Sequence, residues 1–130
     1  MFHKRYVILV VDDIPLIRMG VVDLFVRSGF EALEAENADG AIRILEARRD
    51  IHLVFTDVGM PGTMDGIKLA HYIRDRWPPV KLIVASGQTI AEESQLPVGV
   101  KFFAKPYDEG AIIQEIVDML SEADGGRREA

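Results

Sequence analysis

The sequence contains no cysteine, and this absence excludes several kinds of chemistry. Disulfide bonds, thiol nucleophiles and metal sites with cysteine ligands are all ruled out. The histidines His3, His52 and His71 are widely separated and lack the spacing of metal ligands. Any metal site in this chain must therefore use oxygen ligands, which suit a hard ion such as Mg²⁺ or Mn²⁺.

The chain also lacks an excess of basic residues and a long hydrophobic run. Its formal net charge of -6 argues against nucleic acid as a direct partner. The apolar run "YVILVV" at residues 6–11 is followed by two aspartates and is too short for a signal peptide or a membrane span. We therefore expect a cytoplasmic protein that binds neither nucleic acid nor membrane.

What the chain does contain is a regular alternation of strand-like and helix-like segments. Its 130 residues are enough for one domain with a substantial core. Five strand and helix pairs in strict alternation predict a parallel sheet covered on both faces, and right-handed crossovers favour a doubly wound α/β sheet. The strands are expected at 6–11, 30–35, 51–57, 80–86 and 100–105, and the helices at 14–29, 38–49, 65–77, 89–97 and 108–123.

The helical segments carry apolar residues at the spacing of one buried face. Gly29 is expected to end the first helix, and the proline pair at 78 and 79 to follow the end of the third. The residues expected to face the sheet are Ile17, Val21, Leu24, Phe25, Ala41, Ile42, Leu45, Ile112, Ile113, Ile116, Val117 and Leu120.

Polar residues stand where four of the five strands end. Asp12 and Asp13 follow the first strand, Asp57 ends the third, Ser86 ends the fourth and Lys105 ends the fifth. In open α/β sheets the ligand site lies beyond the carboxyl ends of the strands. We therefore expect these five side chains to meet at one edge of the sheet.

Three converging carboxylates repel one another unless a cation lies among them. Mg²⁺ or Mn²⁺ would suit Asp12, Asp13 and Asp57, with the backbone carbonyl of Gly59 within reach. A hydroxyl and an ammonium group arriving from neighbouring strands could hold the oxygens of a phosphoryl group, as in phosphoryl-transfer sites. In this interpretation Asp57 is the nucleophile and becomes an aspartyl phosphate.

Each of these residues also has an ordinary structural explanation. Asp13 could cap the following helix, and Asp57 could be a turn residue. Ser86 could belong to a simple exit from a strand, and Lys105 could be a solvated surface charge. Their joint occurrence at one edge of one sheet favours a functional site over five independent coincidences.

With these residues identified, the sequence resembles the receiver domain of two-component response regulators over about residues 5–122. The motifs that carry the resemblance are "ILVVDD", "FTDVGMP", "MDG", "IVASG" and "FFAKPY". It implies a flavodoxin-like (βα)5 fold with strand order 2-1-3-4-5. It also implies an acidic metal pair at Asp12 and Asp13, a phosphoacceptor at Asp57, phosphoryl contacts from Ser86 and Lys105, an aromatic switch at Phe102 and a cis bond between Lys105 and Pro106.

The resemblance further implies a function. A sensor histidine kinase or phosphotransfer protein would phosphorylate Asp57 in a Mg²⁺-dependent reaction, and a surface within residues 88–121 would bind a downstream protein. The chain would not be an enzyme beyond its own phosphorylation and dephosphorylation, with Gly59 and Gln88 modulating the phosphoryl lifetime. We expect a receiver domain at 1–122 and a flexible tail at 123–130. A phosphate sink or relay, and a fragment of a larger regulator, remain alternatives.

Two other classes of protein share parts of this pattern. A phosphohydrolase with an aspartate nucleophile would normally carry a second acid two residues later, where this chain has Gly59. A flavin carrier with the same sheet order would need a loop rich in serine, threonine and glycine after the first strand, where this chain has "DDIPLI". Both are disfavoured.

Overall fold

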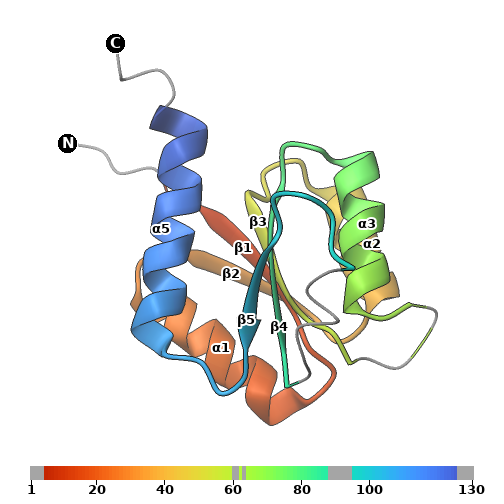
Figure 1. Ribbon diagram of the computed structural model, residues 1–130, viewed down its shortest axis with the longest axis horizontal. Helices are drawn as coiled ribbons and strands as arrows, with labels where there is room; N and C mark the ends of the chain where they lie inside the picture. The colour runs from red at the N-terminus through yellow and green to blue at the C-terminus, as the bar shows by residue number, and fades with distance from the viewer. Residues whose placement is uncertain (1–4, 60–61, 63, 88–94, 126–130) are drawn as a thin grey trace.

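Five parallel strands form a single sheet in the order β2-β1-β3-β4-β5 (Figure 1). The computed structural model describes residues 5–59, 62, 64–87 and 95–125, with side chains through residue 121. The fold class and the strand order expected from the sequence are confirmed. The strands are β1 (Val7–Val11), β2 (Glu31–Ala35), β3 (Leu53–Asp57), β4 (Lys81–Ser86) and β5 (Lys101–Ala104).

Helices cover both faces of the sheet. The two at the ends of the chain pack on one face, and the two in the middle pack on the other (Figure 1). The helix expected at 89–97 falls largely outside the described residues. Residues 95–97 form a turn instead of a last helical turn, because Pro97 restricts the residue before it. The described helices are α1 (Pro15–Arg27), α2 (Ala38–Ala47), α3 (Gly66–Arg76) and α5 (Glu109–Gly125).

The strands send alternate side chains into two apolar layers, as the two-residue period of a strand requires. In β1, Leu9 faces the layer under α2 and α3, whereas Ile8 and Val10 face the layer under α1 and α5. Every residue of β1 is buried. This explains why the strand has a continuous apolar sequence with no polar alternation.

Two residues expected in the core are exposed. Ile17 is 41% exposed, because the first turn of α1 lies at the rim of the sheet, directly after β1 and its acidic pair. Val117 is 42% exposed, whereas Met119, which the expected stripe left out, is buried. Successive helix residues lie about 100° apart. The buried arc of α5 is centred near Ile112 and Ile116, and Val117 lies outside it.

The last helix is longer than the expected domain boundary at residue 122. It continues to Gly125, where a pair of glycines follows the aspartate and disfavours a further helical turn. Residues 123–125 are therefore helical rather than part of the expected tail, and residues 126–130 lie outside the described residues. Gly29 follows α1 with a φ of 100°, which fits the expected end of that helix.

A close backbone approach joins the end of β3 to the start of α3. The Gly66 N–H donates to the Val58 carbonyl at 2.8 Å. A Cβ added at Gly66 would lie 2.2 Å from the Asp57 carbonyl oxygen and 2.8 Å from the Val58 Cα. Both atoms belong to the backbone and cannot rotate away, so only glycine fits here.

We expect Gly66→Ala to destabilise the fold by at least about 2 kcal/mol, since the added methyl group would push α3 away from the end of β3. The measurement is urea unfolding followed by circular dichroism. Gly20→Ala is the matched control, because Gly20 lies within α1 with no atom within 4 Å of an added Cβ. That change should stabilise by up to about 1 kcal/mol. Equal stability of Gly66→Ala and the parent would contradict the packing described here.

Candidate phosphoryl-transfer site

Side chains from the carboxyl ends of the strands meet at one edge of the sheet. Asp57 is the last residue of β3 and Ser86 the last residue of β4, while Asp12, Asp13 and Lys105 follow β1 and β5. The three aspartates each offer a carboxylate oxygen, and these oxygens all lie within 4.8 Å of one another. The structure thus brings together the carboxylates that the strand ends predict.

Asp12 is the most buried of the three acids, at 5% exposure. Its Oδ1 accepts a hydrogen bond from the Ile14 N–H at 3.0 Å. Burial raises the pKa of the Asp12 carboxyl above its ordinary value, the Ile14 hydrogen bond opposes this, and the nearby carboxylate of Asp57 raises it further. The charged form of Asp12 is therefore disfavoured by its surroundings unless a cation is close.

Asp13 does not cap the helix that follows it. The residue at the N-cap position of α1 is Ile14, and it makes no side-chain capping bond. The Asp13 Oδ1 is buried and has no hydrogen-bond partner among the described residues. A buried carboxylate oxygen without a partner is costly. An oxygen of this kind beside two other carboxylates fits a hard divalent cation.

The Asp57 carboxylate is held by Lys105, which follows β5. The Lys105 Nζ donates to the Asp57 Oδ1 at 2.7 Å, and the two side chains are 30% and 15% exposed. This short, charge-assisted contact orients the carboxylate. The Lys105–Pro106 peptide bond is cis, as the resemblance implied.

Ser86 and Gly59 both follow Asp57 in the chain, Gly59 in the loop after β3 and Ser86 at the end of β4. Ser86 is 2% exposed, and its backbone carbonyl accepts from the Lys105 N–H at 2.8 Å. A Cβ added at Gly59 would lie 3.9 Å from the Asp57 Oδ2, so position 59 directly borders the carboxylate. Gln88, the other residue expected to modulate the phosphoryl lifetime, lies outside the described residues.

Phe102 is part of β5 and pairs in register with Val84 of β4. Its ring is half-buried against the apolar layer under α2 and α3, together with Leu96 and Val100. Phe102 therefore contacts both β4, which ends at Ser86, and the segment that precedes β5.

Three residues that support the site were not predicted from the sequence. Arg18 of α1 donates from Nη1 to the Asp12 carbonyl at 2.9 Å and from Nε to Glu34 at 2.8 Å. The end of β2, which carries Glu34, thus supports the acidic pair through this arginine. Thr56 is fully buried and its hydroxyl donates to the Asp57 carbonyl at 2.9 Å. No spacing rule in the sequence links these residues to the strand ends.

The match to known proteins agrees with this geometry. Residues 8–117 match the response regulator receiver domain. The chain belongs to this family. The receiver is 33% identical to the chemotaxis protein CheY of Bacillus subtilis in an alignment of 118 residues, which covers 88% of this chain and 97% of CheY. A response regulator receiver protein from Pseudomonas putida has the same fold, with a TM-score of 0.78 and 29% identity over 90% of this chain and 99% of that one.

Other relatives are much longer than the receiver. It is 34% identical over 109 residues to the response regulator protein FleR of Pseudomonas aeruginosa, covering 82% of this chain and 23% of FleR. Receiver domains of two-component response regulators bind Mg²⁺ at an acidic pocket and interact with sensor histidine kinases and effector domains. None of the described helices of this receiver is long and apolar enough to cross a membrane.

The raised pKa of Asp12 gives a prediction about stability. A folded-state pKa above that of the unfolded chain means that ionised Asp12 destabilises the fold at neutral pH, and that this penalty disappears as the pH falls through the raised pKa toward about 3.9. In metal-free buffer at pH 7, we expect Asp12→Asn to raise the melting temperature, since asparagine keeps an oxygen to accept from Ile14.

The same variant should respond less to Mg²⁺. Mg²⁺ at ten times its Kd should stabilise the parent by about 1.4 kcal/mol, and Asp12→Asn by clearly less at the same concentration. Asp75→Asn is the control, because Asp75 is an exposed acid of α3 and the charge change is identical. Both effects are read by calorimetry. If Asp75→Asn reproduced both of them, net charge and not the acidic cluster would be responsible.

Proposed function

We propose that this receiver accepts a phosphoryl group on Asp57 from a sensor histidine kinase or a phosphotransfer protein, and that the modification alters a surface that binds another protein. The observation that carries the proposal is the cluster of three carboxylates with the Lys105 ammonium on one of them. We further propose a cytoplasmic location and no direct contact with nucleic acid, in line with the net charge of -6.

In the proposed reaction an oxygen of Asp57 attacks the phosphorus of a phosphohistidine in line. An O–P bond forms as the N–P bond breaks, and the departing imidazole nitrogen keeps the electron pair and takes up a proton. Asp12, Asp13 and Asp57, with the Gly59 carbonyl, would hold Mg²⁺ or Mn²⁺. When bound, this ion would neutralise charge that develops on the phosphoryl oxygens.

Two residues would hold the new phosphoryl group. The Lys105 ammonium, 2.7 Å from Asp57 before the reaction, would pair with a phosphoryl oxygen, and the Ser86 hydroxyl would donate to another. The lifetime of the aspartyl phosphate would depend on position 59, because glycine there leaves the Oδ2 side of Asp57 open to water.

Acetyl phosphate with Mg²⁺ tests the chemistry without a kinase. Intact mass spectrometry should show the addition of one phosphoryl group to the parent and none to Asp57→Asn. Asp65→Asn is the matched control, because Asp65 caps α3 close in sequence to Asp57 and stays outside the acidic cluster. It should be labelled like the parent. A label that persisted in Asp57→Asn would remove Asp57 as the phosphoacceptor.

We propose that the signal leaves through the surface within residues 88–121, of which 95–121 are described. Ser86 ends the strand that pairs with β5, and Phe102 lies on β5 beside Leu96 and Val100. A change at Ser86 can therefore pass to Phe102 and the segment before β5. The charge added by phosphorylation would shift a balance between two arrangements of this surface.

Amide chemical shifts measured with Mg²⁺ and beryllofluoride, a phosphoryl mimic, test this route. We expect changes across residues 95–121 in the parent. In Phe102→Ala the changes in α5 should shrink while those at Asp57 and Lys105 remain. Val98→Ala is the control, since Val98 is 93% exposed in the same region. Shift changes confined to the acidic cluster in the parent would contradict this account of signalling.

A further inference from the structure

A pocket of about 630 Å³ opens at the opposite end of the sheet from Asp57. Its lining includes the residues that precede β3 and the first residue of β4, Lys81, together with the ends of α2 and α3. His52 of this lining lies five residues before Asp57 along an extended chain, so the two ends are separated by about 16 Å. We call this cavity the basal pocket.

The basal pocket is positively charged although the chain as a whole is acidic. Its lining carries four cations and two carboxylates, an excess of two positive charges, whereas the full chain has a net charge of -6. Because the pocket is concave, the excess is focused on anything that enters it. The charged lining residues are Arg48, Arg49, Arg76, Lys81, Glu46 and Asp50.

Two of these cations are available to a ligand. Among the described residues, the side chains of Arg49 and Lys81 make no ion pair or hydrogen bond, and Lys81 is half-buried. Arg76 is already engaged, because its Nη1 donates to the Tyr72 hydroxyl at 2.9 Å and its Nη2 lies 3.7 Å from Glu46. Arg49 and Lys81 can therefore bind an anionic group without breaking an existing ion pair or hydrogen bond.

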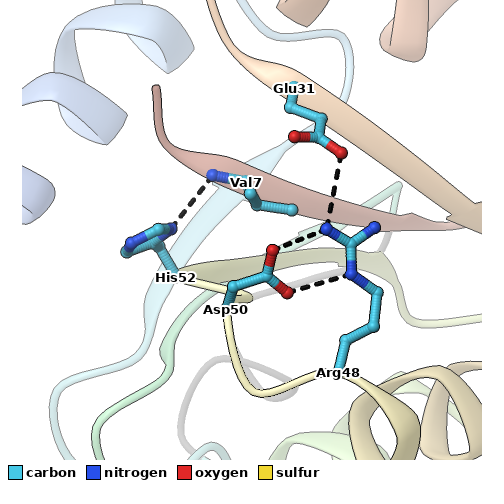
Figure 2. A network of polar contacts seen from close by, with 5 residues as sticks. All are labelled: Val7, Glu31, Arg48, Asp50 and His52. Carbon is cyan, nitrogen blue, oxygen red and sulfur yellow. Dashed lines mark hydrogen bonds and ion pairs between the residues drawn. The ribbon is translucent and has the colours of Figure 1, made fainter. Parts of the chain in front are cut away.

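The remaining arginine keeps the wall of the pocket in place. Figure 2 shows that Arg48 donates hydrogen bonds to Asp50 from two of its nitrogens. One of these nitrogens also donates to Glu31 of β2 at 3.5 Å. In the same view the Val7 N–H donates to the His52 Nδ1 at 3.0 Å. These contacts tie the loop between α2 and β3 to β1 and β2. A wall held in this way loses little freedom when a ligand binds.

Aromatic rings supply a surface of a second kind. Trp77, Tyr6 and His52 are half-buried parts of the lining. The Arg76 guanidinium lies 5.0 Å from the centre of the Trp77 ring, which fixes the indole by a cation–π contact. Flat rings beside free cations suit a ligand that has both a planar apolar group and an anionic group.

From these observations we propose that the basal pocket binds a small organic anion that joins a flat ring to a phosphate-like group. A volume of about 630 Å³ lies within the range of small-molecule sites and accommodates a molecule the size of a nucleoside monophosphate. The phosphate-like group would contact Arg49 and Lys81, and the ring would lie against Trp77. Binding would not require the Asp57 carboxylate, which lies at the other end of the sheet.

The chain contains one tryptophan, and it lies in this pocket, so its fluorescence reports binding directly. The probe is adenosine monophosphate, with adenosine and inorganic phosphate as the two half-ligands. We expect saturable quenching by adenosine monophosphate with a Kd below about 1 mM, and binding at least about tenfold weaker for either half-ligand. The variant Asp57→Asn should bind the probe like the parent.

Variants locate the site. Arg49→Gln and Lys81→Gln should each weaken binding of adenosine monophosphate about three- to fivefold, as expected for the loss of one partly screened charge. Arg43→Gln is the matched control, because Arg43 is an exposed cation of α2 outside the pocket. It should bind like the parent. Absence of saturable quenching, equal binding of adenosine, or an equal loss in Arg43→Gln would each overturn the proposal.

Discussion

Three carboxylates whose oxygens lie within 4.8 Å repel one another, and this receiver has to hold them together against that repulsion. The order of the strands makes the arrangement possible. Because β1 lies beside β3, the acidic pair after β1 reaches Asp57, and because β4 separates β3 from β5, Ser86 lies between Asp57 and the strand that precedes Lys105. The short contact of Lys105 with Asp57 offsets part of the repulsion. The pKa of Asp12 is raised by burial, and among the described residues the Asp13 Oδ1 has no hydrogen-bond partner, so part of the repulsion is left for a cation to offset.

The rest of the chain supplies the rigidity on which this edge depends. The central strands are buried on both faces, between an apolar layer under α2 and α3 and another under α1 and α5. Burial of this kind contributes roughly 25 cal/mol for each Å² of apolar surface. Individual contacts then fix the strand ends themselves. Gly66 brings α3 against the end of β3, and Arg18 ties the turn after β1 to Glu34. The three carboxylates are therefore attached to strand ends that the rest of the fold keeps from moving apart.

Most of this architecture could be predicted from the sequence, because it depends on local patterns. The apolar runs, the helical spacing and the residues at the strand ends gave the parallel sheet and the members of the acidic cluster, whereas the strand order was implied by the resemblance to receiver domains. Three kinds of feature could not be predicted from the sequence. Whether Val117 or Met119 is buried depends on the rotation of α5 on the sheet, which a broad apolar stripe does not determine. The roles of Arg18 and Gly66 depend on how one element packs against another, which the local pattern of either element does not reveal. The basal pocket gathers residues from four separate stretches of the chain, so no single motif predicts it.

The two ends of the sheet carry opposite charge, and this raises the question of whether they influence each other. The acidic cluster follows the carboxyl ends of the strands, and the cations of the basal pocket stand near their amino ends. Two sites are coupled only when an element between them has two arrangements that both ligands distinguish. The central strands β1, β3 and β4 are buried, and close packing leaves them little room for a second arrangement. The element that the proposed output surface shares with the basal pocket is α5, which places Leu120 in the pocket lining. An anion in the basal pocket would therefore affect phosphorylation at Asp57 only to the extent that α5 moves, and by reciprocity phosphorylation would change the affinity of that anion by the same factor.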